Sequence, residues 1–317
     1  MKVSEIIQNS QKPLFTYELL PPLKGGNIGK LYRTIDNLFE FDPAYINITY
    51  HQHEIEYVER SDGLLEKKIV QKRPGTVAIA SAIMNKYNIP VVPHLICGGF
   101  TREETEDALI DLSFLGIENV LALRGDPVSG QKRFTPEKGG HTHASELVEQ
   151  IVDMNNGKYL NPGIKHQLSS NFCIGVAGYP EKHYESPNME EDIYWLKHKV
   201  NKGAEYIVTQ MFFDNAAFFN FFQKCRDAGI NIPIIPGLKP ISAFNDIRLI
   251  PSSFHLNIPY ELCKEVQNCK TKEEVKQVGV EWTIAQCKEL IDFGVPGLHF
   301  FTLGQTDNIR KIVSEVY

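Results

Sequence analysis

Eight short runs of apolar residues alternate along the chain with longer segments in which apolar residues recur every three or four positions. Each run is nearly continuous in apolar side chains, which is typical of strands that are covered on both faces of a sheet. The longer segments have the period of helices that pack one face against such a sheet. The pattern predicts strands at Phe15–Leu19, Tyr45–Thr49, Val91–Leu95, Val120–Leu123, Phe172–Ala177, Tyr206–Thr209, Ile232–Pro236 and Gly297–Phe301.

Sequence signals for helix ends support the predicted helices. Thr101 and Glu104 have the spacing of a capping box, in which each side chain accepts a hydrogen bond from the other residue's backbone N–H. Ile193–Val200 and Ala217–Cys225 also have helical length and spacing, and Pro251–Glu274 is predicted to be largely helical. Four glycines precede a predicted strand by a few residues and are well placed as helix C-caps, namely Gly116, Gly203, Gly229 and Gly294.

Strands that alternate with helices predict a parallel sheet. Eight such units favour one (β/α)8 barrel of the TIM type, a single domain over residues 1–317. The alternative is a doubly wound open sheet, which usually needs a glycine-rich turn after its first strand to bind a dinucleotide. Here Glu18–Pro22 ends the first strand without such a motif. Two longer loops, Gln52–Gly75 and Pro127–Gly140, are expected to be lids or binding segments.

Composition and charge exclude several classes of protein. Hydrophobic residues make up 42% and charged residues 23% of the chain, which excludes disordered, collagen-like and small disulfide-stapled proteins. The net charge of -6 argues against a large nucleic-acid interface. The six cysteines include no Cys-x-x-Cys pair, so we expect reduced thiols and a cytoplasmic location. No apolar run reaches the roughly 20 residues of a membrane span, and the N-terminus lacks the apolar core of a signal peptide.

Polar side chains gather where the predicted strands end. In a (β/α)8 barrel the active site forms at those carboxyl ends. Two carboxylates are among these residues, and general acid–base chemistry needs such groups. The full set is Glu18, Thr49, Tyr50, His94, Arg124, Gly125, Asp126, Tyr179, His183, Gln210, Lys239 and Thr302.

Glu18 is the main candidate for a catalytic acid. It stands within an apolar strand end, where burying an ionised carboxylate is costly. Burial favours the protonated form, which can donate a proton at neutral pH. The alternative is a structural salt bridge to a neighbouring arginine or lysine.

Arg124, Gly125 and Asp126 place a charge pair directly after the fourth predicted strand. Gly125 lets the backbone approach a ligand closely, and Arg124 suits a phosphate, a carboxylate or an aromatic face. An arginine–aspartate pair that merely fixes a turn explains these residues equally well.

The histidines allow a metal hypothesis. His51 and His53 lie on one side of an extended segment, His94 stands at the next strand end, and His141 and His143 form a second pair. Metal-dependent barrels collect histidines and carboxylates in this way. No carboxylate follows either pair at ligand spacing, so we do not expect a catalytic metal.

The helix after the fifth predicted strand has a distinctive polar face. Asp192, Trp195, His198 and Lys199 lie roughly along one side of it, because their spacing follows the helical repeat. Such a face can hold the ribose and phosphates of a nucleotide, and it can equally be a solvated surface.

Taken together, these strand ends resemble those of the methylenetetrahydrofolate reductase family. The similarity covers essentially the whole chain in the right order, with each motif at a predicted strand end. The matching stretches are Tyr17–Pro22, Asn47–Tyr50, Pro93–Cys97, Leu123–Asp126, Ala177–Glu181 with His183, Thr209–Asp214, Ile235–Leu238 and His299–Leu303.

The resemblance implies a barrel that binds FAD noncovalently and reduces 5,10-methylenetetrahydrofolate to 5-methyltetrahydrofolate with NAD(P)H. The two substrates use the same flavin face in turn, in a ping-pong scheme that feeds one-carbon metabolism and methionine synthesis. By resemblance, Glu18 is the general acid that assists opening of the folate's five-membered ring. Asp126 lies near the flavin and the pterin, where a carboxylate favours a cationic iminium.

The resemblance also assigns binding residues. Gln210 is expected to hydrogen-bond the pterin, with Asp246 and Gln305 facing the folate. His183, His198 and Lys199 are expected partners for the FAD phosphates. The residues expected to line the cofactor are Thr49 (near the nicotinamide), Tyr50, His94, Arg124, Gly125, Asp126, His143, Ala144, Tyr179, His183, Asp192, Trp195, His198 and Lys199.

Some positions depart from the family pattern. His143 stands where the family often has tyrosine, and Trp195 and His198 stand where some members have asparagine and arginine. Gln305 stands where an arginine can reach the folate. The chain stops soon after the eighth strand, so a regulatory domain and control by S-adenosylmethionine are not expected. We expect a homo-oligomer with no nucleic-acid or membrane partner.

Two other functions remain as alternatives. One is a metal-dependent hydrolase or aldolase barrel that uses the histidine pairs, which tight stoichiometric metal in place of flavin would favour. The other is a non-catalytic flavin or pterin carrier, which would bind its ligand without turnover. A carrier needs no positioned acid such as Glu18 or Asp126.

Overall fold

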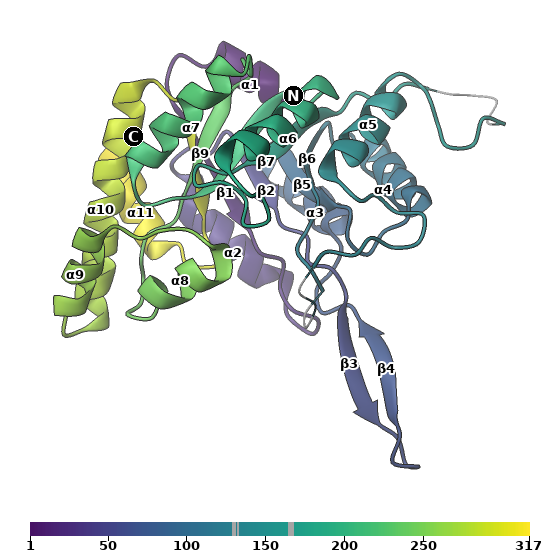
Figure 1. The fold of residues 1–317 in the computed structure, drawn as a ribbon, viewed down its shortest axis with the longest axis horizontal. Helices are drawn as coiled ribbons and strands as arrows, with labels where there is room; N and C mark the ends of the chain where they lie inside the picture. Colours follow the sequence, from purple (N-terminus) through teal and green to yellow (C-terminus); the bar gives the residue numbers. More distant parts are fainter. Residues whose placement is uncertain (129–130, 132, 164–167) are drawn as a thin grey trace.

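The structure, a computed structural model, describes residues 1–128, 131, 133–163 and 168–317. Its centre is a closed barrel of parallel strands in the order β1-β10-β9-β8-β7-β6-β5-β2, with helices around it (Figure 1). All eight predicted strands are confirmed, and their ends differ from the prediction by no more than two residues. The strands are β1 (Leu14–Leu19), β2 (Tyr45–Ile48), β5 (Val91–Ile96), β6 (Asn119–Leu123), β7 (Cys173–Gly178), β8 (Tyr206–Met211), β9 (Ile234–Leu238) and β10 (Gly297–Phe301).

The segment Gln52–Gly75 is more regular than the loop expected there. It contains an antiparallel hairpin, β3 (Glu54–Glu59) and β4 (Leu65–Val70), which projects away from the barrel (Figure 1). Charged residues interrupt both of its strands, and most of its described side chains are exposed. The pattern of continuous apolar runs did not predict the hairpin, because such runs are typical of strands that are covered on both faces.

Helices follow the barrel strands, as the alternating pattern predicted. The segment Pro251–Glu274 contains the end of one helix, all of a second and the start of a third, which confirms its helical character. None of the described helices is long and apolar enough to cross a membrane. The helices are α1 (Val3–Asn9), α2 (Ile28–Phe39), α3 (Thr76–Tyr87), α4 (Arg102–Phe114), α5 (Ala144–Asn155), α6 (Met189–Asn201), α7 (Asn215–Asp227), α8 (Asp246–Phe254), α9 (Tyr260–Asn268), α10 (Lys272–Phe293) and α11 (Asp307–Val316).

The predicted helix ends are confirmed in detail. Thr101 Oγ1 accepts a hydrogen bond from the backbone N–H of Glu104 at 3.1 Å, and Glu104 Oε2 accepts one from the backbone N–H of Thr101 at 2.8 Å. These two bonds satisfy N–H groups that the first turn of α4 cannot pair. Positive φ values at the ends of four helices require the glycines found there, namely Gly116, Gly203, Gly229 and Gly294.

The amino-terminal end of the barrel is closed by α1. Val3 packs with apolar residues that stand near the beginnings of the strands, including Tyr45, Cys173 and Tyr206. Asn119 at the start of β6 fixes the helix, because its Oδ1 accepts a hydrogen bond from the backbone N–H of Val3 at 2.8 Å. Ligands therefore have to reach the barrel from the opposite end, where the strands finish.

Gly175 in β7 lies where the barrel interior leaves little room. The ring of Tyr206, its register partner in β8, covers it, and a β-carbon at Gly175 would overlap Tyr206 Cζ. Gly175→Ala is therefore expected to lower the free energy of unfolding by about 1–3 kcal/mol, the usual cost of overpacking.

Urea denaturation of the wild-type protein and of Gly175→Ala would measure this loss of free energy. Gly75→Ala is the matched control, because Gly75 has a φ of -65° and no described atom within 4 Å of its β-carbon position. Equal unfolding midpoints for the two variants would contradict the packing of Tyr206 over Gly175.

Candidate active site

The closed parallel barrel brings the carboxyl ends of its strands to one rim, where the predicted polar residues stand. Glu18 is near the end of β1, and Gln210 is near the end of β8. Arg124 and Asp126 follow β6, and Tyr179 follows β7. These residues therefore share one end of the barrel although they are far apart in the sequence.

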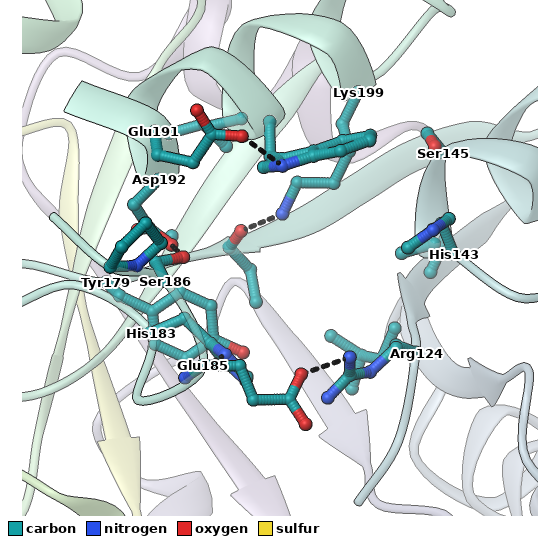
Figure 2. A pocket seen from close by; sticks show the side chains of 18 residues that line it. Arg124, His143, Ser145, Tyr179, His183, Glu185, Ser186, Glu191, Asp192 and Lys199 are labelled. Atoms are coloured by element: carbon teal, nitrogen blue, oxygen red, sulfur yellow. Dashed lines mark hydrogen bonds and ion pairs between the residues drawn. The ribbon is translucent and has the colours of Figure 1, made fainter. Parts of the chain in front are cut away.

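A cavity of about 340 Å³ opens at this rim, beside the ends of β6 and β7 and next to α5 and α6 (Figure 2). Its volume lies within the range of small-molecule sites, about 300–1,000 Å³. Eight of the predicted cofactor residues line it: Arg124, His143, Ala144, Tyr179, His183, Asp192, Trp195 and Lys199. Other lining residues were missed because they stand in loops and helix starts away from the strand ends, among them Ser145, Glu185, Ser186 and Glu191.

One face of α6 forms a wall of this cavity. Asp192, Trp195 and Lys199 all line it, as their spacing predicted. Lys199 Nζ donates a hydrogen bond to the backbone oxygen of Ala177 at 2.6 Å. Burial lowers the pKa of Lys199 to about 8, while the nearby Asp192 carboxylate opposes the shift. An anionic ligand in the cavity would stabilise the charged form of this lysine.

The amino-terminal end of α5 faces the same cavity. His143 is the N-cap residue, and Ala144 is the first residue of the helix. The free N–H groups of a helix N-terminus favour an anion. The His143 ring stacks on Trp195 of α6, with ring centroids 5.1 Å apart and planes at 21°. The cavity thus combines an end that favours anions with flat aromatic surfaces.

Arg124 points toward the loop that follows β7. Its Nη1 pairs with Glu185 Oε2 at 2.5 Å (Figure 2). Its guanidinium lies 5.0 Å from the Phe134 ring centroid. The described ion pair of Arg124 is therefore with Glu185 rather than with Asp126. Gly125 has a φ of +87°, and a β-carbon there would lie 3.3 Å from Ile96, so the backbone itself requires glycine.

Tyr179 and His183 form an aromatic pair at the end of β7. Their ring centroids are 4.8 Å apart in an edge-on arrangement. His183 Nδ1 accepts a hydrogen bond from the backbone N–H of Glu185 at 3.2 Å, so a neutral His183 ring carries its proton on Nε2. Burial lowers the pKa of His183, and the positive charge of Arg124 lowers it further. His183 therefore offers the cavity a neutral hydrogen-bond donor.

Six predicted cofactor residues are not part of the described cavity wall, namely Thr49, Tyr50, His94, Gly125, Asp126 and His198. Thr49 Oγ1 donates a hydrogen bond to the backbone oxygen of Leu19 at 3.2 Å, and the Tyr50 ring packs against Phe100 with centroids 5.1 Å apart. The His198 ring lies edge-on to an aromatic ring of the wall. Their contact with a cofactor stays a prediction.

Asp126 and Gln210 stand nearer the barrel mouth and also lie outside that wall. Asp126 is exposed, and its backbone oxygen accepts a hydrogen bond from Gln52 Nε2 at 2.6 Å, which links the loops that follow β2 and β6. Gln210 Oε1 accepts a hydrogen bond from the backbone N–H of Met211 at 2.9 Å. The amide nitrogen of Gln210 is the donor that this side chain offers to a ligand.

A buried polar cluster lies beneath the rim, inside the barrel. Glu18 and His299 are both buried, and Glu18 Oε2 is 4.0 Å from His299 Nε2. His299 Nδ1 is 2.9 Å from Thr16 Oγ1. His94 also lies in this region, with its Nε2 3.4 Å from Asn47 Nδ2. Within the described structure Glu18 faces His299, and the alternative of a salt bridge to an arginine or lysine is not found there.

The interior around this cluster disfavours charge. Burial lowers the pKa of His94 to about 4; the Glu18 carboxylate opposes this shift, and His299 and His51 add to it. Polar residues at strand ends did not predict this cluster, because Thr16 and His299 stand within strands. The register pairs Thr16 with His299, and Glu18 follows two residues later on the same face of β1.

A second cavity, of about 220 Å³, lies beside the ends of β9 and β10 and against α8. Asp246 and Gln305, both predicted to face the folate, line it together with Lys239. Asp246 Oδ2 is 3.8 Å from Lys239 Nζ and accepts hydrogen bonds from the backbone N–H groups of Ser242 and Ala243. Asp246 thus holds the start of α8, and Lys239 and Gln305 are the better placed to meet a ligand.

The described part of the chain contains no set of ligands for the hypothesised metal ion. No group of three or more histidine, cysteine, aspartate or glutamate side chains is arranged there to hold a metal ion. The second histidine pair has other contacts, since His141 lies 2.5 Å from Gln150 Oε1 and His143 stacks on Trp195.

Comparison with known proteins agrees with the geometry. The family model described as methylenetetrahydrofolate reductase matches residues 2–317. The chain is 32% identical over 312 residues to methylenetetrahydrofolate reductase (NADH) 1 of Arabidopsis thaliana, which covers 95% of this chain and 48% of the plant protein. It is 28% identical over 293 residues to 5,10-methylenetetrahydrofolate reductase of Escherichia coli K12, which covers 92% of this chain and 86% of the bacterial protein. The chain spans about half the length of the eukaryotic relatives it matches.

A solved structure shows the same fold. An uncharacterized protein from Clostridium thermocellum, which binds two copies of 5-methyl-5,6,7,8-tetrahydrofolic acid, superimposes with a TM-score of 0.60 over 99% of this chain and 97% of its own. Sequence identity is 16%, so this similarity supports the fold alone. The family match, in contrast, extends over nearly every residue that forms the barrel and its rim. The chain therefore belongs to the methylenetetrahydrofolate reductase family.

Proposed function

We propose that the protein reduces 5,10-methylenetetrahydrofolate to 5-methyltetrahydrofolate with NAD(P)H, in two successive hydride transfers through FAD. This product feeds one-carbon metabolism and methionine synthesis. The observation that carries the proposal is the buried carboxyl group of Glu18 at the barrel end that also holds a cavity suited to anions. Membership in the methylenetetrahydrofolate reductase family supports the same chemistry.

The cavity of Figure 2 has the features that a flavin dinucleotide needs. Lys199 and the N-terminus of α5 suit a diphosphate, and the rings of His143 and Trp195 suit a flat heteroaromatic group. The buried carboxylate of Asp192, which accepts a hydrogen bond from Ser186 Oγ at 2.7 Å, suits ribose hydroxyl groups. When bound, FAD would supply the two-electron carrier between nicotinamide and folate.

Glu18 is assigned the proton transfer. The five-membered ring of the substrate opens more readily when its leaving nitrogen receives a proton, and an acid held in the barrel interior can supply one. Asp126 is assigned the stabilisation of the cation that ring opening produces. Gln210 is assigned to the pterin edge and Thr49 to the nicotinamide.

The second cavity is assigned to the tail of the folate. That tail ends in carboxylates, and Lys239 is a half-buried cation at the cavity wall. Burial lowers the pKa of Lys239, and the charge of Asp246 opposes this effect. Gln305 is uncharged, so Lys239 can supply the positive charge that an arginine at position 305 would supply.

The proposal includes a homo-oligomeric assembly and a cytoplasmic location. All six cysteines are free, and four of them are buried. Free thiols of this kind persist in a reducing compartment.

An anaerobic visible spectrum of the purified protein tests the proposal. NADH and then methylenetetrahydrofolate are added to the same cuvette. We expect a flavin band that bleaches with the first addition and returns with the second. If neither NADH nor NADPH bleaches the flavin band, the assignment of NAD(P)H as the electron donor is wrong. A protein that neither contains flavin nor can be reconstituted with it would overturn the whole proposal.

Glu18→Gln is expected to separate the two half-reactions. An amide keeps the size of the side chain but carries no acidic proton, so folate reduction should fall by at least about 10²-fold while flavin reduction by the nicotinamide changes little. Stopped-flow absorbance of the flavin measures each step alone. Glu106→Gln, at a buried glutamate in α4, is the control for removing a buried carboxyl. Equal loss of both half-reactions would remove Glu18 from the folate step.

FAD affinity is expected to fall as the pH rises above the pKa of Lys199, about 8 in the free protein. The charged lysine attracts the diphosphate and is fully charged well below this pH, so affinity is highest there. It should decline by at most about tenfold per pH unit above it, because one proton is involved. Fluorescence titration of apoprotein with FAD measures the trend.

Lys199→Met should weaken binding and flatten this pH dependence. Lys197→Met is the matched control, since Lys197 stands on the same helix but donates to the backbone oxygen of Gly229 outside the cavity. An unchanged pH dependence in Lys199→Met would assign the diphosphate to other residues.

A further inference from the structure

The segments that follow β7 and α8 are joined through one carboxylate. Glu181 Oε2 accepts a hydrogen bond from the backbone N–H of Asn257 at 2.7 Å, and Asn257 Nδ2 donates to the same oxygen. The other carboxylate oxygen, Oε1, is buried and has no hydrogen-bond partner among the described residues. Burial raises the pKa of Glu181, and the hydrogen bonds from Asn257 oppose this shift. The described hydrogen bonds that stabilise the Glu181 carboxylate therefore both come from Asn257.

An aromatic contact joins the same two segments. The rings of Tyr184 and His255 lie with their centroids 4.7 Å apart and their planes at 30°. His255 is the C-cap of α8 and has a φ of +54°, in the left-handed region that glycine prefers. The hydroxyl of Tyr184 donates a hydrogen bond to Glu185 Oε1 at 3.1 Å, and Glu185 pairs with Arg124. The carboxyl end of α8 is therefore connected to the wall of the cavity in Figure 2.

α8 itself is a weak helix. Of its nine residues, all of them described, Ile250 alone is buried, and Pro251 has no backbone N–H to donate to the preceding turn. So short a helix is not stable by itself in water. The helix nevertheless forms a wall of the second cavity, through Leu249, Ile250, Ser253 and Phe254. The shape of that cavity therefore depends on how the two ends of α8 are fixed.

We propose that Glu181 is a positioning residue that fixes the carboxyl end of α8 and thereby sets the affinity of the second cavity for the folate tail. Asp246 fixes the amino end through the backbone N–H groups that it binds. α8 follows β9 and Glu181 follows β7, so their contact joins the two sides of β8, at whose end Gln210 is assigned to the pterin. This inference rests on the proposed function, in which the second cavity receives the tail.

Glu181→Ala is expected to weaken the binding of folates that carry the tail. Without the carboxylate, Asn257 loses its described acceptor, and the ligand has to order α8 when it binds, at a cost in affinity. The Kd of 5-methyltetrahydrofolate should rise by at least about threefold, within the range of such indirect effects. The KM for methylenetetrahydrofolate should rise similarly, while reduction of the flavin by the nicotinamide changes little. Calorimetric titration of the holoenzyme measures the Kd.

A ligand without the glutamate separates this role from a general loss of stability. The Kd of 5-methyltetrahydropteroate, which lacks that part of the tail, should change little in Glu181→Ala. Glu106→Ala is the matched control, because the Glu106 carboxylate also accepts a backbone N–H, from Leu160 at 2.8 Å, but stands outside both cavity walls. Equal losses of affinity for the two ligands, or a tail-dependent loss in Glu106→Ala, would overturn the inference.

A double-mutant cycle tests the contact itself. Asn257→Ala removes the side-chain donor and keeps the backbone N–H, so its effect on the Kd of 5-methyltetrahydrofolate should be smaller than that of Glu181→Ala. In the Glu181→Ala background the same change should have no further effect, because the acceptor is already absent. Losses that add in the double variant would show that the two residues act independently and would contradict the proposal.

Hydrogen exchange of the resting holoenzyme needs no turnover. We expect the backbone amides of α8 to exchange faster in Glu181→Ala than in wild type and in Glu106→Ala. Unchanged exchange would overturn the role of Glu181 at α8, and faster exchange with an unchanged Kd would overturn its link to the folate tail. A wild type that neither reduces methylenetetrahydrofolate nor binds 5-methyltetrahydrofolate would instead overturn the proposed function, while the exchange of α8 still tests the contact.

Discussion

The hydrogen-bonded ladder between β1 and β10 is the constraint on which the site depends. It joins the first and last strands of the barrel, with Thr16 opposite His299 and Glu18 opposite Phe301. Closure removes the open edges that a twisted parallel sheet would otherwise expose. It also buries a carboxyl group on β1 and an imidazole on β10 close to each other.

The cavity proposed for the cofactor shows how residues on two helices can form one surface. His143 at the start of α5 and Trp195 on α6 are two positions at which the resemblance predicts a departure from the family pattern, and the structure stacks their rings on each other. A histidine at one position and a large aromatic ring at the other thus form a single surface. Because the two helices supply one ring each, the wall of the cavity depends on how α5 and α6 pack against the barrel.

Much of the fold could be predicted from the sequence, because buried strands and helices need apolar residues in a regular pattern. Strands covered on both faces consist of nearly continuous apolar residues, and helix ends have a capping box or a glycine with positive φ. The β3–β4 hairpin has no continuous apolar run, because most of its described side chains are in contact with solvent. The face of α6 was predictable as well, since helical periodicity alone places Asp192, Trp195 and Lys199 together.

The three-dimensional grouping of the strand-end residues could not be predicted from the sequence. Position along a strand shows that Glu18 and His94 come near the rim, but the cluster beneath it also depends on which residues of neighbouring strands share a register. That register is a property of the closed barrel, and only the structure shows that it sets Thr16 opposite His299.

Two opposite electrostatic environments lie next to each other at the rim. Lys199 and the N-terminus of α5 favour an anion in the cavity proposed for the cofactor. The barrel interior around Glu18 disfavours charge, as the lowered pKa of His94 shows. The proposed reaction needs both, because its carrier is held by phosphates while its acid must stay uncharged until the folate takes the proton. Separating them onto different elements, helices for the anion and strands for the acid, lets each environment be set without disturbing the other.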